Sequence, residues 1–380
     1  MQANSTQTSN STQTSNSTPG SIECSAPRLA LWLALAGTLG AAGALGAPSK
    51  APPPEAGSGL SAPAARAVVQ ADIARIAATA GGEVGVLATH LESGLTLSLN
   101  ADERFPMAST FKIAVAGRIL AEVDAGRLSL DQLVAVEPPD VLVSEGIADI
   151  FPFPGLSVSI RNLIESMLTR SDNTATNVLT RVAGEAPAVT AWVRGLGIQE
   201  MRIDGDTNEI IARFFSLPPG QGSVNDRLKP LLEAHPELES LDNQPNPPFD
   251  DDARDTTTPA AMVALLTRIS ERHALSASST DVLLGAMQRD ITGLKRLRAM
   301  LPPGTVVRDK TGTIGGTVND VGIIDLPDGR GRVAIAVYIK KSARPFEERE
   351  RAIAEIGRSV YDYMLIESAT FTARHGERGS

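Results

Sequence analysis

Strand-like runs lie near both ends of the folded part of this chain, and this arrangement restricts the fold more than any other feature. Residues 83–100, EVGVLATHLESGLTLSLN, indicate two strands around a Ser-Gly turn. Further runs follow at 304–313, 318–326 and 332–341, while residues 109–302 have a mostly helical pattern. The two ends must therefore meet in one antiparallel sheet of about five strands, flanked by helices, with an all-helical subdomain inserted between them. This is an α+β fold.

Helices are also expected outside the strands. Residues 64–82 have helical periodicity and end on glycines, and residues 345–368 form an amphipathic pattern. The folded body therefore begins near Ala64, and we assign residues 63–370 to one domain.

The residues before this domain have a different composition. Residues 1–27 contain the polar repeat NSTQTSNSTQTSNST and are expected to be disordered. Residues 28–47, RLALWLALAGTLGAAGALGA, favour a signal peptide, and an uncleaved membrane anchor is the alternative. Residues 48–62 form a linker rich in Pro, Gly and Ser. We therefore expect an exported protein, periplasmic or secreted, that contacts a membrane only through an uncleaved N-terminal segment.

Composition excludes several classes of function. The chain has 380 residues, a net charge of -9 and 4% aromatic residues, which argues against a nucleic-acid partner. Its one cysteine, Cys24, precedes the folded region, and its four histidines show no H-E-x-x-H spacing. We therefore expect no disulfide framework, no metal and no cofactor.

A serine and a lysine lie at the start of an apolar helical run, in PMASTFKIAVAGRIL at 106–120. Ser109 or Thr110 could cap the helix, and Lys112 could extend to water. Alternatively, the two side chains share one helical face, and a desolvated lysine could remove the serine proton. Because roughly one Ser-x-x-Lys match is expected by chance in a chain of this length, this motif decides nothing alone.

Two further motifs favour the chemical interpretation. Ser171-Asp172-Asn173 follows the apolar helical stretch LIESML, and Lys310-Thr311-Gly312 lies on the first of the late strands. Ser-Asp-Asn is also common in turns and caps, and Lys-Thr-Gly could be an exposed strand end. The three motifs in this order are much harder to explain by chance.

The chain resembles the class A β-lactamases. The strings GVLATHLESG, NADERFPMASTFK, SDNTATNVL, RDTTTPAAM and DKTGTIGGTVND are all similar to that family, and the resemblance covers about residues 65–368. It implies that residues 63–370 are a serine β-lactamase-like catalytic domain, a monomer that acts on a β-lactam or an acyl-D-Ala-D-Ala-like substrate. The biological role that it implies is β-lactam breakdown and antibiotic resistance.

The resemblance also implies roles for individual residues. Ser109 would attack the lactam carbonyl, Lys112 would take part in removing its proton, and Ser171 would relay a proton to the leaving nitrogen. The backbone N–H groups of Ser109 and Thr313 would form the oxyanion hole. The expected substrate-binding residues are Asn173, Lys310, Thr311, Gly312, Thr313 and Arg298.

The base that hydrolyses the acyl-enzyme is missing from its usual position. The family uses a glutamate on an Ω-shaped loop, three residues after the aspartate of an Arg-x-Asp string. Here that string is Arg202-Ile203-Asp204, and Thr207 occupies the glutamate position. The family's arginine that pairs with the loop's closing aspartate, Asp255, aligns with Gly205. The loop is also far longer, with an insertion at about 212–252 that includes a short helical pattern at 226–241.

Three interpretations of this loop remain open. A re-routed loop could bring Glu209 into the base position, or Asp206 less well. Otherwise the protein is an acylating but poorly deacylating relative: a penicillin binder, an esterase or a peptidase-like protein. A non-catalytic binding module would leave Ser109, Lys112 and Lys310 unexplained. We therefore predict a serine β-lactamase-type hydrolase, with Glu209 as the candidate deacylating base.

Overall fold

The fold is taken from a computed structural model, which describes residues 61–142, 146–218 and 223–376. The predicted polar repeat, the signal peptide or anchor, and nearly all of the linker lie outside the described residues. Within the described ranges, no helix is both long enough and apolar enough to cross a membrane. The same ranges contain no group of three or more His, Cys, Asp or Glu residues placed to hold a metal ion.

The predicted five-stranded antiparallel sheet is confirmed. Its strand order is β2-β1-β9-β8-β7, and every pairing is antiparallel. The strands are β1 Glu83–His90, β2 Thr96–Leu99, β7 Val307–Ile314, β8 Thr317–Asp325 and β9 Arg332–Lys340. The two ends of the domain therefore meet where β1 pairs with β9, and β7, which carries Lys310, lies at one edge.

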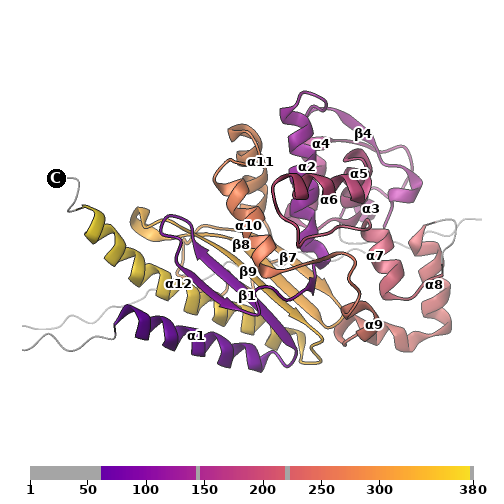
Figure 1. Cartoon of the computed structure of the whole chain (residues 1–380). Coiled ribbons are helices and arrows are strands. Elements are labelled where there is room, and N and C mark those ends of the chain that lie inside the picture. The colour runs from indigo at the N-terminus through magenta and orange to yellow at the C-terminus, as the bar shows by residue number, and fades with distance from the viewer. Residues whose placement is uncertain (1–60, 143–145, 219–222, 377–380) are drawn as a thin grey trace, which may run out of the picture. The chain divides into compact units, whose positions relative to one another are not determined.

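Two helices cover one face of this sheet. Helix α1, Ala62–Thr79, and helix α12, Phe346–Gly376, lie side by side along it (Figure 1). The alternation of β9 shows why both faces are covered: Val333, Ile335 and Val337 pack toward these helices, whereas Ala334 and Ala336 pack toward the helical subdomain. Both sets are fully buried, so the sheet is the middle layer of this domain.

The helical subdomain surrounds the apolar run that follows Ser109. This run forms α2, Lys112–Asp124, which packs against α4 Ile160–Thr169, α5 Asn173–Val182, α6 Glu185–Gly195 and α11 Ala277–Gln288. Contacts on several sides explain why α2 is apolar around most of its circumference. Helix α10, Pro259–Ser270, connects this subdomain to the sheet, where it packs on β1, β8 and β9.

The long insertion forms helices of its own. It begins within α7, Thr207–Phe214, and continues through α8 Val224–Ala234, the 3-10 turn η3 Pro236–Asn243 and α9 Pro247–Asp250. The helix expected at 226–241 is thus split at Pro236, which begins η3. Phe214 makes edge contacts with Phe215 and Phe249, so both ends of the insertion share one aromatic cluster.

Short elements complete the chain. They are β3 Phe105–Pro106, η1 Ala108–Phe111, β4 Leu133–Ala135, η2 Pro138–Asp140, α3 Ile147–Ile150, β5 Ser157–Ser159, β6 Thr256–Thr257 and η4 Pro327–Gly329. The β3–β6 pair is important for the site, because it joins the segment before Ser109 to the end of the insertion.

Candidate active site

Ser109 lies in the turn that opens the central helix. It is part of η1, which runs directly into α2, and Ala108 before it has a left-handed backbone with φ of 44°. Such a conformation is uncommon for a residue with a side chain and often marks a functional turn. Thr110 and Phe111 are buried while Ser109 stays partly accessible, so the turn presents the serine at the surface of the core.

Lys112 does not extend to water, which excludes the simple structural interpretation of this lysine. Its side chain is fully buried. Its Nζ donates to the carbonyl oxygen of Ser171 and to Asn173 Oδ1, both at 2.7 Å, and it contacts Ser171 Oγ at 3.2 Å. Burial, and then the nearby charge of Lys310, lower the pKa of Lys112 well below its ordinary value, although Asp172 opposes this shift. A neutral amine one helical turn from Ser109 can accept a proton.

The middle residue of Ser171-Asp172-Asn173 fixes the positions of the other two. Asp172 is buried and caps α5 by accepting the N–H of Ala175 at 3.0 Å. The same carboxylate also accepts the N–H of Ile147 at 2.8 Å and the hydroxyl of Ser166 at 2.7 Å. With Asp172 held in this way, Ser171 and Asn173 both reach Lys112. The structure thus brings the first two motifs together.

The third motif lies on edge strand β7, directly beside η1. A Cβ added to Gly312 would lie 2.6 Å from the carbonyl oxygen of Met107, so only glycine lets β7 approach the serine turn this closely. Lys310 is fully buried, and burial is the main cause that lowers its pKa. Thr311 is buried whereas Thr313 is exposed, so the end of the motif is open to a ligand.

The structure does not bring Arg298 to the Lys-Thr-Gly motif, because its guanidinium contacts other groups. It forms an ion pair with buried Asp309 and donates to the carbonyl oxygens of Met287 and Gln288 at 3.0 and 3.2 Å. Arg296 reaches the motif instead: its guanidinium donates to Thr313 Oγ1 at 2.7 Å.

Arg296 is a site residue that the sequence analysis missed. It is buried, pairs with Glu350 at 3.2 Å and donates to the carbonyl oxygens of Gly312 and Asn319 at 3.2 and 2.7 Å. The string KRLRAM offers two arginines that are two positions apart. Neighbours at that spacing point in different directions, and only the backbone path shows which one faces β7.

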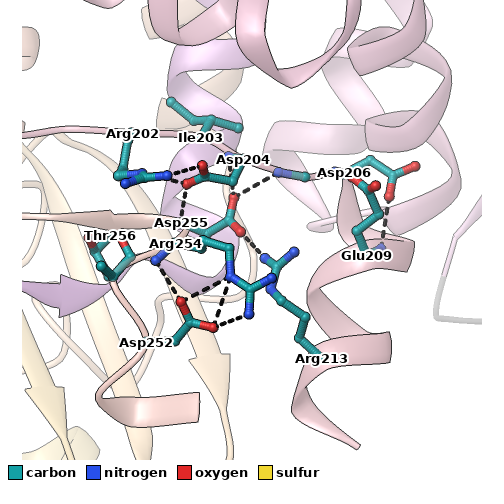
Figure 2. Close-up of polar contacts among 12 residues, drawn as sticks. Arg202, Ile203, Asp204, Asp206, Glu209, Arg213, Asp252, Arg254, Asp255 and Thr256 are labelled. Atoms are coloured by element: carbon teal, nitrogen blue, oxygen red, sulfur yellow. Dashed lines mark hydrogen bonds and ion pairs between the residues drawn. The ribbon is translucent and has the colours of Figure 1, made fainter. Parts of the chain in front are cut away.

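The entry and exit of the inserted loop are joined by a network of charges and backbone groups (Figure 2). Asp255 Oδ1 accepts the N–H groups of Asp204 and Gly205 at 2.8 and 3.1 Å, and Asp204 Oδ2 accepts the N–H of Asp255 at 3.0 Å. Arg202 pairs with Asp204, and Arg213 pairs with Asp255. Arg213, from inside α7, thus supplies the positive charge that the family pattern places at Gly205.

The two carboxylates considered as deacylating bases belong to the start of α7. Asp206 is its N-cap and accepts the N–H of Glu209 at 2.9 Å, while Glu209 accepts the N–H of Asp206 at 3.1 Å. Figure 2 shows both side chains at this helix end, away from the pair of Arg202 and Asp204. Glu209 is exposed and has no hydrogen bond to Lys112 or Asn173 among the described residues. The structure therefore does not bring Glu209 to the lysine.

Thr207, the first residue of α7, contacts helix α5, which carries Asn173. It is buried, and its N–H donates to Asn177 Oδ1 at 3.0 Å. Asn177 follows Asn173 by one turn of α5, on the same face of the helix. Thr207 therefore contacts α5 at the residue one helical turn beyond Asn173, which holds Lys112.

Comparison with known proteins agrees with this geometry. The model of the beta-lactamase enzyme family matches residues 68–364. A beta-lactamase from Chitinophaga pinensis has 30% identity and a TM-score of 0.62, covering 78% of this chain and 98% of its own. An ancestral class A beta-lactamase, that of the last common ancestor of Gram-negative bacteria, has 34% identity and a TM-score of 0.63. The match covers 77% of this chain and 99% of the ancestral one. The TLA-1 extended-spectrum beta-lactamase has 28% identity and a TM-score of 0.65, and the match covers 79% of this chain and 99% of TLA-1.

These matches favour a hydrolase over the poorly deacylating relative that the sequence analysis left open. The fold, the three motifs in one place and the family match all lead to the same conclusion. The chain belongs to the beta-lactamase enzyme family and is a serine hydrolase of the class A β-lactamase type.

Proposed function

We propose that Ser109 is the nucleophile that opens the β-lactam ring, with neutral Lys112 as its base. Lys112 takes the Ser109 proton while Oγ bonds to the lactam carbonyl carbon. The carbon–nitrogen bond then breaks, and the proton passes from Lys112 through Ser171 to the leaving nitrogen. The observation that carries this proposal is that buried Lys112 Nζ lies 3.2 Å from Ser171 Oγ, as this relay requires.

We further propose that β7 binds the substrate. The backbone N–H groups of Ser109 and Thr313 would stabilise the developing oxyanion. The positive charges of Lys310 and Arg296 would attract the substrate carboxylate, and the exposed hydroxyl of Thr313 is aligned by Arg296 at 2.7 Å. Thr311 would donate a hydrogen bond to the substrate carboxylate, and Asn173 would contact the substrate amide. Gly312 would allow β7 to approach the substrate closely.

Intact-mass measurement after mixing with benzylpenicillin tests the acylation step. We expect a transient adduct that peptide mapping places on Ser109 and that is absent from the Ser109→Ala variant. An adduct on another residue, or none with any β-lactam tried, would contradict the proposal. The Arg298→Lys variant should still form the adduct, because Arg298 lies outside the proposed catalytic and substrate-binding residues.

We also propose an exported monomer that removes β-lactams outside the cytoplasm and so confers antibiotic resistance. The composition of residues 28–47 supports a signal peptide or anchor, and the net charge of -9 argues against a nucleic-acid partner. Cell fractionation with N-terminal sequencing tests export. A full-length chain in the cytoplasm would contradict it, and a dimer in sedimentation would contradict the monomer.

A further inference from the structure

A β-lactamase must activate a water molecule to hydrolyse its acyl-enzyme, and the carboxylates nearest the expected position are already committed. Asp206 and Glu209 bond reciprocally to each other's backbone N–H at the start of α7. Turning either side chain toward Lys112 would break this capping box, whose loss costs a helix about 1 kcal/mol. The exposed Glu209 would also have to leave solvent. Neither carboxylate contacts Lys112 or Asn173 among the described residues, and Thr207 is the residue between them that contacts α5.

The Thr207 hydroxyl has the features of a water-binding group. The residue is 7% exposed, and its Oγ1 is buried with no hydrogen-bond partner among the described residues. Buried hydroxyls are nearly always paired, and an unpaired one commonly binds a water molecule. The bond from the Thr207 N–H to Asn177 Oδ1 holds this residue against Asn177, which lies one turn of α5 beyond Asn173.

We propose that the hydroxyl of Thr207 positions the hydrolytic water and that Lys112 is the base for deacylation as well as for acylation. This inference rests on the proposed acylation of Ser109. Lys112 is again available after acylation, because its first proton has left through Ser171 to the lactam nitrogen. Burial lowers the pKa of this amine, which favours its neutral form.

The atoms and charges of this step balance. The water oxygen bonds to the acyl carbonyl carbon while Lys112 Nζ accepts one water proton. The bond from that carbon to Ser109 Oγ then breaks, and Lys112 returns the proton to Oγ. The product leaves as a ring-opened acid, and both side chains are regenerated without a further reactant.

Stopped-flow measurement with a chromogenic cephalosporin separates acylation from deacylation. In the Thr207→Val variant, which keeps the shape but removes the hydroxyl, we expect deacylation to slow about tenfold or more while acylation changes less than about threefold. The Thr207→Ser variant should retain the wild-type deacylation rate. A smaller loss in Thr207→Val, or an equal loss in Thr207→Ser, overturns the role of Thr207.

The Asp206→Asn/Glu209→Gln double variant tests the role of Lys112, since both new residues can keep their caps. We expect its deacylation rate to match wild type and still to decrease as the pH falls, because Lys112, which faces Lys310 and Asp172, becomes protonated. A rate about tenfold lower, or loss of this pH dependence, overturns the proposal. If wild type forms no acyl-enzyme, the proposed function itself fails.

Discussion

Arg213 forms an ion pair with Asp255 across a sequence separation of 42 residues. Their side chains are 17% and 4% exposed, so the pair is largely shielded from water. Asp255 also accepts the N–H groups of Asp204 and Gly205, and its carbonyl oxygen accepts the N–H of Met107 at 3.0 Å. One aspartate thus connects the start of the loop, its end and the segment before Ser109.

Removing the arginine should therefore destabilise the whole domain. In the Arg213→Met variant the buried carboxylate of Asp255 loses its counter-charge, and we expect the free energy of unfolding to fall by about 3 kcal/mol. Urea denaturation followed by circular dichroism measures this loss.

The neighbouring pair between Arg254 and Asp252 provides a matched control (Figure 2). Arg254 is 51% exposed, so the Arg254→Met variant should lose less than about 1 kcal/mol. Equal losses in the two variants would mean that Arg213 has no special role in closing the loop.

The two arginines near β7 should differ in their effect on acylation. The Arg296→Lys variant keeps the charge but cannot make the forked contacts with Thr313, Gly312 and Asn319. We expect its second-order acylation rate constant with benzylpenicillin to fall about tenfold, because a hydrogen bond from a charged group is worth about 1.5–3 kcal/mol.

The Arg298→Lys variant should acylate within about threefold of wild type, because this residue contacts Asp309 and not the site motif. A larger effect on acylation for Arg298 than for Arg296 would reverse the assignment made from the structure.

The sheet and the site motifs could be predicted from the sequence because their signals are local. The runs of alternating residues predicted the strands, and the placement of strands at both ends required them to meet. Ser109, Lys112, Ser171 and Lys310 were chosen from three short strings, and the structure brings these strings together.

Side-chain directions and long-range partners could not be predicted in the same way. Arg213 lies in the inserted region, and nothing near it in the sequence indicates that it pairs with Asp255. The position of Glu209 could have been predicted, because Asp206-Thr207-Asn208-Glu209 is a capping-box pattern that indicates a helix start. That pattern occupies both carboxylates before any catalytic role is considered.

The buried Lys112 should also make stability depend on pH in a defined direction. Its folded pKa is well below the ordinary 10.5 because of burial, and then the nearby Lys310 charge. Between those two values the unfolded chain binds a proton that the folded protein does not. Stability therefore rises with pH through this window, by up to about 1.4 kcal/mol per pH unit from Lys112.

The Lys112→Met variant lacks this contribution. We expect the difference in unfolding free energy, wild type minus Lys112→Met, to increase in urea melts as the pH rises toward the ordinary lysine pKa of 10.5. A constant or decreasing difference would mean that the folded lysine keeps its ordinary pKa.

Placing a carboxylate at Thr207 should accelerate deacylation. By resemblance, the family's glutamate occupies this position, and a positioned base contributes roughly 10²–10⁴-fold. We expect Thr207→Glu to deacylate at least about tenfold faster than wild type, although the larger buried side chain should cost about 1–3 kcal/mol of stability. The Thr207→Gln variant adds nearly the same volume without a base, so it should not be faster. Equal deacylation rates in these two variants would mean that position 207 does not face the acyl carbonyl, and that the family register fails at this loop.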